Sequence, residues 1–368
     1  MIRKNRIDFP FLIIITTLTL SGILIFISAS LGISAKNEVK YYSILTNQLL
    51  LGFVGGTIGA FVLSKFPLQI LRKNSFWAFI ASIVLMFAVF IPGLGLSHGG
   101  ATRWIELGPL SFQPSEILKI TYVLYLATWL SMVGKKGVQS MHDGFIPFLI
   151  ISGLAALGLI LQKDNDTMIV MMSAGTSMFI VAGARIKHIL ILFLIALLAL
   201  SGLIAMRPYI RERIVSFFNP HEKTQSTGFQ IQHSLIAIGS GGFDGRGFGQ
   251  SLQKFTYLPE PVGDSIFAVA AEEFGFIGAL FLITLFLLFG WRGLRISNHI
   301  TDNFSRLVVV GIVILICVQA FWNMATMMKI IPISGLPLPF VSHGGTALFF
   351  TLCACGILLN ISKQQHTK

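Results

Sequence analysis

Ten apolar runs, each near the length of a helix that crosses a bilayer, divide this chain. A helix needs about 20 mainly apolar residues to cross about 30 Å of hydrocarbon. The chain is 54% hydrophobic and only 11% charged, too few polar residues to cover a soluble core. We therefore expect an all-α polytopic membrane protein of about ten helices, forming one domain over 1–368. The runs are 9–31, 44–64, 76–96, 113–133, 145–162, 167–184, 188–206, 266–290, 307–328 and 344–362.

The first run, 9–31, is longer than the apolar core of a cleavable signal peptide, so we expect it to be a span. Placing both termini in the cytoplasm puts 15 of the 27 basic residues on that side, as the positive-inside rule favours. Twelve of the 15 acidic residues then lie on or near the outer side. The basic residues assigned to the cytoplasm are Arg3, Lys4, Arg6, Lys65, Arg72, Lys73, Lys135, Lys136, Arg185, Lys187, Arg292, Arg295, Arg306, Lys363 and Lys368.

One outer connection, 207–265, is far longer than the others, and loops of that length are functional or disordered. Its many aromatic residues argue against disorder. We expect short interfacial helices there, with an amphipathic helix over 230–238 and a compact, glycine-rich turn segment after it.

Asp264 lies where this loop re-enters the membrane at the start of the eighth run. Partial burial would raise the pKa of its carboxyl, as would the charge of Glu260, and a raised pKa suits a general base. Asp directly before a helix also serves as an N-cap that accepts backbone hydrogen bonds. Position alone favours the N-cap.

Other charged residues fall inside apolar runs, where an ionised side chain needs a partner or a cavity. Glu272 and Glu273 follow two turns into the eighth run; they either serve a functional site or pair with a basic residue of another span. Glu116 and Lys119 share a helix face at the outer end of the fourth run. That pair is either a packing salt bridge, which the sequence favours, or the border of a headgroup cavity.

Several cations of the outer connections lie near the interface, where a phosphate or diphosphate headgroup is the available anion. Each is equally consistent with a solvated or lipid-snorkelling side chain. The candidates are Arg103 after the third run and Arg207, Arg211, Arg213, Arg246 and Lys254 in the long loop.

The last outer connection, from Lys329 to Thr346, contains three prolines and three glycines. Irregular backbone at membrane depth requires surrounding protein or a water-filled cavity, so we expect this segment, with Ser342 and His343, to line the site. His343 is either a proton carrier or a hydrogen-bonding fixture.

Other chemistries lack their sequence signatures. No G-x-G-x-x-G, P-loop lysine, H-E-x-x-H or Cys/His pattern occurs, which disfavours nucleotide, organic-cofactor and zinc chemistry. The net charge of +12 comes from scattered basic residues rather than a stripe, so we expect no nucleic-acid partner.

A series of motifs resembles the SEDS family of shape, elongation, division and sporulation proteins, the ten-span peptidoglycan glycosyltransferases that include FtsW, RodA and SpoVE. The resemblance covers nearly the whole chain and is strongest to the FtsW branch. Three segments depart from the family pattern: 162–167, 263–265 and 342–345. The motifs are Arg103-Trp104-Ile105, Gln113-Pro114-Ser115-Glu116 with Lys119, Leu258-Pro259-Glu260 with Asp264, Glu272-Glu273-Phe274-Gly275, and Pro337-Leu338-Pro339 with Ser342 and Gly344-Gly345.

The resemblance implies a glycosyltransferase that polymerises lipid II at the outer face of the bacterial cytoplasmic membrane, in septal synthesis during cell division. It implies Asp264 as the base, undecaprenyl diphosphate as the leaving group, and loop cations, a divalent ion such as Mg²⁺ or Mn²⁺, or both to neutralise the diphosphate. The implied partners are a class B penicillin-binding protein and divisome proteins. The alternatives are an elongation polymerase like RodA, a lipid II flippase that uses the intramembrane charges, and a scaffold.

Overall fold

The computed structural model describes residues 2–3, 6–35, 37–98, 101–107, 110–218 and 227–367. Lys4 and Lys368 of the expected cytoplasmic set, and residues 219–226 of the long loop, lie outside the described residues. Within the described ranges, nine helical segments are long and apolar enough to cross a membrane. The sixth predicted run, 167–184, forms the 17-residue helix α7 (Asn165–Val181), which is not among these nine. The polytopic all-α prediction is confirmed.

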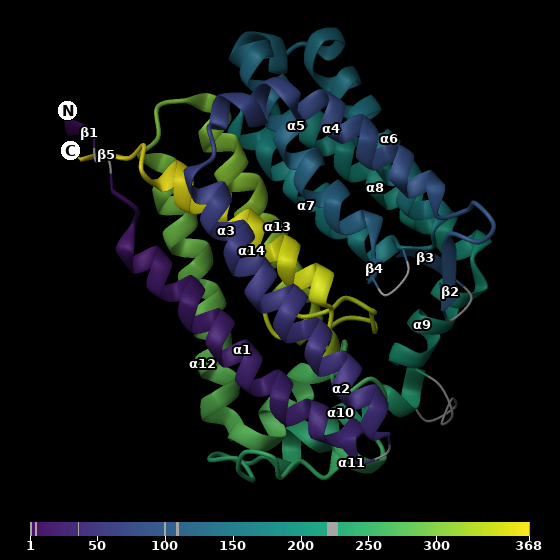
Figure 1. The fold of residues 1–368 in the computed structure, drawn as a ribbon. Coiled ribbons are helices and arrows are strands. Elements are labelled where there is room, and N and C mark those ends of the chain that lie inside the picture. Colours follow the sequence, from purple (N-terminus) through teal and green to yellow (C-terminus); the bar gives the residue numbers. More distant parts are fainter. Residues whose placement is uncertain are drawn as a thin grey trace.

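The helices run up and down through one bundle (Figure 1). Besides α7, the spans are α1 (Phe9–Ser34), α2 (Glu38–Thr46) continued by the π-helix η1 (Asn47–Gly55) and α3 (Gly56–Lys65), α4 (Leu68–Ala88), α5 (Pro114–Val138), η2 (Met141–Phe145) with α6 (Ile146–Leu161), α8 (Ile186–Met206), α12 (Ile266–Asn298), α13 (Asn303–Met327) and α14 (Gly345–Ser362).

Short polar side chains mark several helix starts. The carboxylates of Asp8, Asp164 and Asp302 each accept a backbone N–H from the first turn of α1, α7 and α13, satisfying donors that the helix leaves free. Pro114 begins α5, where its missing N–H costs nothing. The local sequence thus sets these boundaries.

The third span differs from the prediction of 76–96. Helix α4 begins after Pro67 and ends at Ala88, and the remaining residues fold outside it. Residues 89–94 form turns, and an antiparallel three-stranded sheet follows, made of β2 (Gly95–His98), β3 (Ala101–Leu107) and β4 (Leu110–Phe112) in the order β2-β3-β4. The last third of the predicted run therefore lies outside the helix, and only its final residues, Gly95 and Leu96, belong to this sheet.

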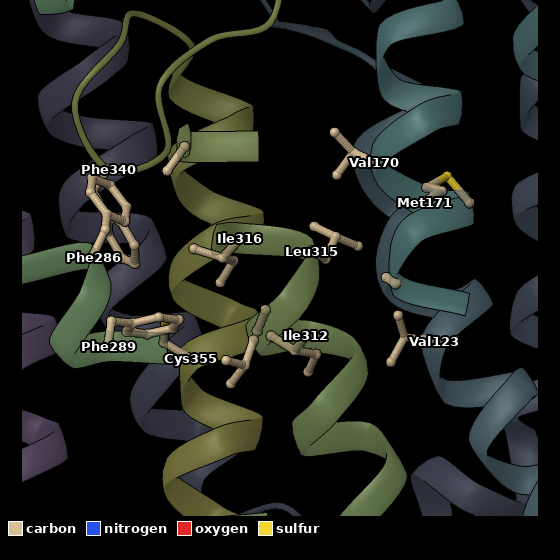
Figure 2. Packing of buried hydrophobic residues seen from close by; sticks show 14 of the residues in the cluster. Val123, Val170, Met171, Phe286, Phe289, Ile312, Leu315, Ile316, Phe340 and Cys355 are labelled. Carbon is tan, nitrogen blue, oxygen red and sulfur yellow. The ribbon is translucent and has the colours of Figure 1, made fainter. Parts of the chain in front are cut away.

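The buried core surrounds α13. In α13 and α14, 72% of the most apolar 18-residue window is buried, whereas none of that window is buried in α8. Figure 2 shows Ile312, Leu315 and Ile316 of α13 near side chains of α5, α7, α12 and α14. The outer position of α8 leaves lipid as its main neighbour.

The long loop carries three helices: α9 (Pro208–Phe218), α10 (Thr227–Ser240) and α11 (Gln253–Thr256). Helix α10 includes the helix predicted at 230–238, and the glycine-rich segment after it forms turns. Figure 1 places α10 and α11 at the end of the bundle opposite the two chain termini.

At that other end, the short strands β1 (Ile2–Arg3) and β5 (His366–Thr367) pair antiparallel. Arg292 at the end of α12 lies 2.7 Å from the Asp8 carboxylate, and Gln365 also donates to it. Both termini therefore lie at the same end of the helices (Figure 1).

Candidate active site

Asp264 lies in the turn that leads from the long loop into α12. The N-cap of α12 is Ser265, and its side chain makes no capping hydrogen bond, so the N-cap interpretation of Asp264 is wrong. The backbone carbonyl of Asp264 accepts a hydrogen bond from Asn323 of α13 at 2.7 Å. Gln230 of α10 donates to the Ser265 hydroxyl at 2.9 Å. Contacts from α10 and α13 thus hold the turn on both sides.

The environment of that carboxyl favours its neutral form. Oδ1 of Asp264 is buried and has no hydrogen-bond partner among the described residues. Burial raises the pKa of Asp264 to about 7, with a further increase from the charge of Glu260; Gln230 and Arg213 oppose these effects. A carboxyl with a pKa near neutrality can accept a proton and remain a useful base at physiological pH.

The last outer connection, 328–344, is hydrogen-bonded directly to this turn. Ser342 donates its hydroxyl to the carbonyl of Gly263 at 2.6 Å and accepts the N–H of Leu338 at 2.8 Å. The backbone N–H of His343 donates to the carbonyl of Val262 at 2.7 Å. Sequence reasoning placed this segment at the site, and the structure joins it to Asp264.

His343 itself is held as a neutral ring. Its imidazole stacks on Phe26 with the ring centroids 6.1 Å apart, and Nε2 is buried without a partner among the described residues. Burial, and then the charge of Lys40, lower the pKa of His343 to about 4. The lowered pKa disfavours a proton carrier. The described hydrogen bond that fixes His343 is made by its backbone N–H and not by the ring.

Three amide side chains that sequence reasoning overlooked hold the same connection from inside the membrane. Gln48 donates to the carbonyl of Ser342 at 3.1 Å and accepts the N–H of Gly344 at 2.9 Å. Gln319 and Asn323 of α13 donate to the carbonyls of Pro337 and Leu336 at 2.9 and 2.8 Å. Buried amides within apolar runs were the available sequence signal, because polar groups there require partners.

Glu116 and Lys119 form a buried ion pair, with 2.8 Å between Oε1 and Nζ. Lys119 also donates to Oε1 of Gln319 at 3.1 Å, which links the pair to the last outer connection. A small cavity of about 20 Å³ lies beside these three side chains. The contacts support the packing interpretation, and they extend it to the backbone beside Asp264.

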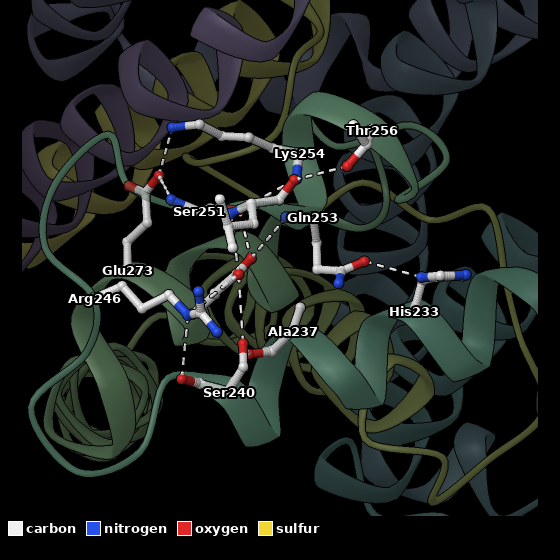
Figure 3. A network of polar contacts seen from close by, with 11 residues as sticks. His233, Ala237, Ser240, Arg246, Ser251, Gln253, Lys254, Thr256 and Glu273 are labelled. Carbon is white, nitrogen blue, oxygen red and sulfur yellow. Dashed lines mark hydrogen bonds and ion pairs between the residues drawn. The ribbon is translucent and has the colours of Figure 1, made fainter.

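Glu273 and Lys254 form a second buried pair, only 2.6 Å apart (Figure 3). Lys254 donates further to the carbonyl of Ser28 at 3.0 Å, and the Ser28 hydroxyl donates to Glu273. From the sequence, Lys254 was expected to lie at the membrane interface and bind a lipid headgroup. That expectation is corrected, because the Lys254 ammonium is buried beneath α1 and paired with Glu273.

Glu272, next to Glu273 in α12, binds the same part of the long loop. Its carboxylate accepts the Ser251 hydroxyl at 2.5 Å and the N–H of Leu252 at 3.1 Å, and Nε of Arg246 lies 3.6 Å from Oε1. The basic partners of the two glutamates, Arg246 and Lys254, come from the long loop, whereas the sequence analysis offered a basic residue of another span as the alternative to a functional site. These contacts hold the glycine-rich segment against α12, which indicates a structural role.

The arginines near the site divide into paired and unpaired groups. Arg213 of α9 lies 2.9 Å from the Asp166 carboxylate, which also accepts the N–H of Gly335 at 3.2 Å. Arg103 of β3 donates to the carbonyl of Gln162 at 3.2 Å and to that of Lys163. These contacts join α9 to the first turn of α7, and the sheet to the α6–α7 connection.

Arg207 is half-buried and Arg211 is exposed, and neither forms an ion pair within the described residues. Lys329, at the start of the last outer connection, is half-buried in a left-handed backbone conformation with φ +55°. Of the predicted cations, Arg207 and Arg211 therefore keep the most freedom to meet an anion.

No three His, Cys, Asp or Glu side chains in the described part of the chain are placed to hold a metal ion together. The described residues therefore do not fit a metal site built by the protein alone. Mg²⁺ is commonly held by one or two carboxylates together with substrate phosphates.

The sequence model of a family described as cell cycle protein, FtsW/RodA/SpoVE, matches residues 9–367. Stage V sporulation protein E of Bacillus subtilis (strain 168) is 39% identical over 356 residues, covering 96% of this chain and 97% of that protein. A probable peptidoglycan glycosyltransferase FtsW of Geobacter sp. (strain M18) is 36% identical over 366 residues, covering 100% of this chain and 99% of that protein.

Solved structures share the fold. A chain from a peptidoglycan synthase complex that coordinates polymerization and crosslinking superposes with a TM-score of 0.80, at 24% identity, over 98% of this chain and 99% of that chain. The Thermus thermophilus rod shape determining protein RodA gives a TM-score of 0.71, at 24% identity, over 98% of both chains. With the family match over nearly its whole length, this chain belongs to the FtsW, RodA and SpoVE family of cell cycle proteins.

Proposed function

We propose that this protein is a peptidoglycan glycosyltransferase that polymerises lipid II at the outer face of the bacterial cytoplasmic membrane, in septal wall synthesis, with both termini in the cytoplasm. The observation that carries the proposal is the buried, unpartnered carboxyl oxygen of Asp264 at the membrane re-entry point of the long loop. Relatives named FtsW, similar over nearly their full length, support the reaction class.

In the proposed reaction, the Asp264 carboxylate accepts the proton of the 4-hydroxyl of the acceptor's GlcNAc. The resulting nucleophile attacks C1 of the donor's MurNAc and expels undecaprenyl diphosphate, with inversion at C1. A pKa near 7 suits this step, since the base is ionised in a useful fraction while remaining basic.

The leaving diphosphate requires positive charge. Arg207 and Arg211, which have no ion-pair partner among the described residues, are the proposed protein contribution, with Arg213 shared between Asp166 and the site. We propose that any Mg²⁺ or Mn²⁺ requirement reflects an ion held mainly by the diphosphate, since the described side chains form no cage. Loss of activity in EDTA with recovery on adding Mg²⁺ or Mn²⁺ would support such an ion.

The proposed partners are a class B penicillin-binding protein and other divisome proteins. The structural neighbour from a synthase complex that couples polymerization with crosslinking supports a transpeptidase partner. Co-purification with that partner, and a polymerisation assay with and without it, would test this assignment.

The experiment that tests the function compares the wild type with Asp264→Asn and Asp264→Ala on labelled lipid II. We expect polymer formation to fall at least 100-fold in both variants, because proton transfer loses its acceptor. The matched control is Glu106→Gln, an exposed carboxylate of β3. Wild-type polymer yield from Asp264→Asn would remove Asp264 as the base.

A flippase is the competing assignment. The buried charges that a transporter would use are paired within the protein, Glu116 with Lys119 and Glu273 with Lys254, which disfavours it. Movement of labelled lipid II across liposomes without polymer formation, unaffected by Asp264→Asn, would favour transport instead.

A further inference from the structure

A cavity of about 390 Å³ lies between α4 and α5, in the half of these helices that ends in basic residues. Helix α4 begins here, with Arg72 and Lys73 in its first turns, and α5 ends here with Lys135 and Lys136 in its last turn. Asp264 lies at the opposite end of the bundle, the end at which Pro114 begins α5. The lining residues are Gln69, Arg72, Lys73, Ser75, Phe76, Tyr125, Thr128 and Met132.

The two cations of this cavity have no acidic partner within the described residues. Arg72 donates to the Ser131 hydroxyl at 3.2 Å, and its guanidinium lies 5.6 Å from the ring centroid of Phe304. Those contacts orient the guanidinium without neutralising it. Lys73 is exposed beside it. The cavity therefore carries two uncompensated positive charges.

Its walls are mainly apolar and aromatic. The rings of Phe76 and Tyr125 lie 5.5 Å apart, and Met132 is 65% exposed on the α5 side. The hydroxyls of Ser75 and Thr128 hydrogen-bond to each other at 2.9 Å, so neither requires a ligand. A cavity with apolar walls and cations at one edge matches an amphipathic anion.

We propose that this cavity binds an anionic phospholipid of the cytoplasmic leaflet, with its phosphate at Arg72 and Lys73 and its acyl chain along Phe76 and Met132. Basic pockets between membrane helices on the cytoplasmic side are suited to anionic headgroups, and arginine binds phosphate oxygens through paired donors. A free phosphate would leave the apolar walls uncovered, and a neutral lipid would leave the charges unmatched. The choice of the cytoplasmic leaflet rests on the proposed cytoplasmic location of both termini; the proposal does not depend on the glycosyltransferase reaction.

The test is native mass spectrometry of the purified full chain titrated with phosphatidylglycerol or phosphatidylcholine. We expect tighter binding of phosphatidylglycerol, and a loss of at least tenfold in Arg72→Gln/Lys73→Gln. The matched control is Lys135→Gln/Lys136→Gln, which removes the same charge from the same end outside the cavity and should change binding less than twofold. Equal losses in the two double variants would overturn the proposal, since they would indicate a general charge effect.

A third arm adds inorganic phosphate as a competitor; complete displacement of the lipid at millimolar phosphate would identify a free-anion site and overturn the proposal. Lys73→Glu serves as a single variant that is expected to fold, because Lys73 is exposed and contacts no described acidic residue. It should keep the wild-type circular dichroism spectrum and still lose at least fivefold in phosphatidylglycerol binding. Unchanged binding in this folded variant would also overturn the proposal.

Discussion

At the scale of single residues, Asp264 combines burial with nearby negative charge. Both effects disfavour ionisation, and their sources differ: burial comes from the packing of the turn, whereas the second contribution comes from the carboxylate of Glu260. Glu260 is held in a left-handed backbone conformation with φ +44°, and its carbonyl accepts the N–H groups of Gly263 and Ser265. The two contributions can therefore be separated by substitution.

We expect kcat/KM for lipid II polymerisation to fall as the pH drops below about 7, because the base becomes protonated. Glu260→Gln removes the like charge, so the acid limb of the pH profile should move to lower pH. Initial rates at subsaturating lipid II between pH 5 and pH 9 measure both curves. Glu106→Gln, distant in sequence and exposed, should leave the limb in place; an unmoved limb in Glu260→Gln would contradict the assignment.

The same raised pKa predicts a stability cost. A carboxyl whose pKa rises from 3.8 to about 7 on folding is neutral in both states at low pH; its burial penalty accumulates as the pH rises from about 3.8 to about 7 and is constant above that. The stabilisation by Asp264→Asn should therefore grow by roughly 2–3 kcal/mol between pH 5 and pH 7 and stay constant from pH 7 to pH 8.

Thermal unfolding in detergent at pH 5 and pH 8 measures this gain as a widening difference in Tm. A loss of activity accompanied by higher stability is the pattern expected when a functional group is held in an unfavourable environment. A constant Tm difference across this range would show that the Asp264 carboxyl is not perturbed in the folded protein.

The residues of the site were only partly predictable. The last outer connection was expected at the site from its irregular backbone at membrane depth, whereas Asp264 was assigned as the base from the family motifs, because its position alone favoured an N-cap. Lys254 and Arg103 were expected to serve an anion but instead contact Glu273 and the α6–α7 connection. Their partners lie far away in the sequence, and no local pattern specifies such pairs.

At the scale of elements, α12 contains a break that receives the long loop. Gly275 has φ +65°, and the glycine-rich segment packs directly against it. The backbone N–H of Arg246 donates to the carbonyl of Glu272, and that of Gly247 donates to the carbonyl of Glu273. In the other direction, the backbone N–H groups of Phe276 and Ile277 donate to the carbonyls of Gly242 and Phe243. Loop and helix thus satisfy each other's backbone groups at the break.

Gly275→Ala should disrupt this contact. A Cβ at that position would lie 2.3 Å from the backbone nitrogen of Gly245, in a conformation that alanine disfavours. We expect a loss of roughly 2 kcal/mol or more, seen as a lower Tm and faster trypsin cleavage of the 241–256 segment. Gly239→Ala is the control, because a Cβ there meets no atom within 4 Å and α10 should tolerate it. Similar Tm values for the two variants would contradict this account.

The sheet β2–β4 shows where element prediction failed. Hydrophobicity alone assigned 76–96 to the membrane, but the helix ends at Ala88, a turn segment follows, and β2, β3 and β4 then pair with one another. Strand pairing depends on contacts between separate segments, so a single apolar run does not reveal it.

At the scale of the whole molecule, the polytopic helical class was predictable, with nine candidate spans within the described residues where about ten were expected. The order in which the helices are buried was not predictable. Each run is apolar on most of its faces, so its sequence meets the requirement of the bilayer without showing which face meets protein. The result is a bundle in which α13 is central and α8 is peripheral, although α8 has the higher mean hydropathy. Hydropathy therefore measures exposure to lipid as much as burial in protein.

This difference in burial predicts how strongly the same Leu→Ala substitution destabilises the protein in a central and in a peripheral helix. Leu126 of α5 is fully buried, whereas Leu198 of α8 is 62% exposed to the surroundings of the protein. Leu126→Ala should leave a cavity between packed helices and cost roughly 2–5 kcal/mol, whereas lipid can fill the space left by Leu198→Ala at little cost. Thermal unfolding of the two variants in the same lipid nanodiscs compares identical chemical changes at the two positions. Equal Tm losses would mean that α8 is packed against protein in the membrane, by a partner or a second copy, and that its position at the edge of the bundle does not describe the assembled state.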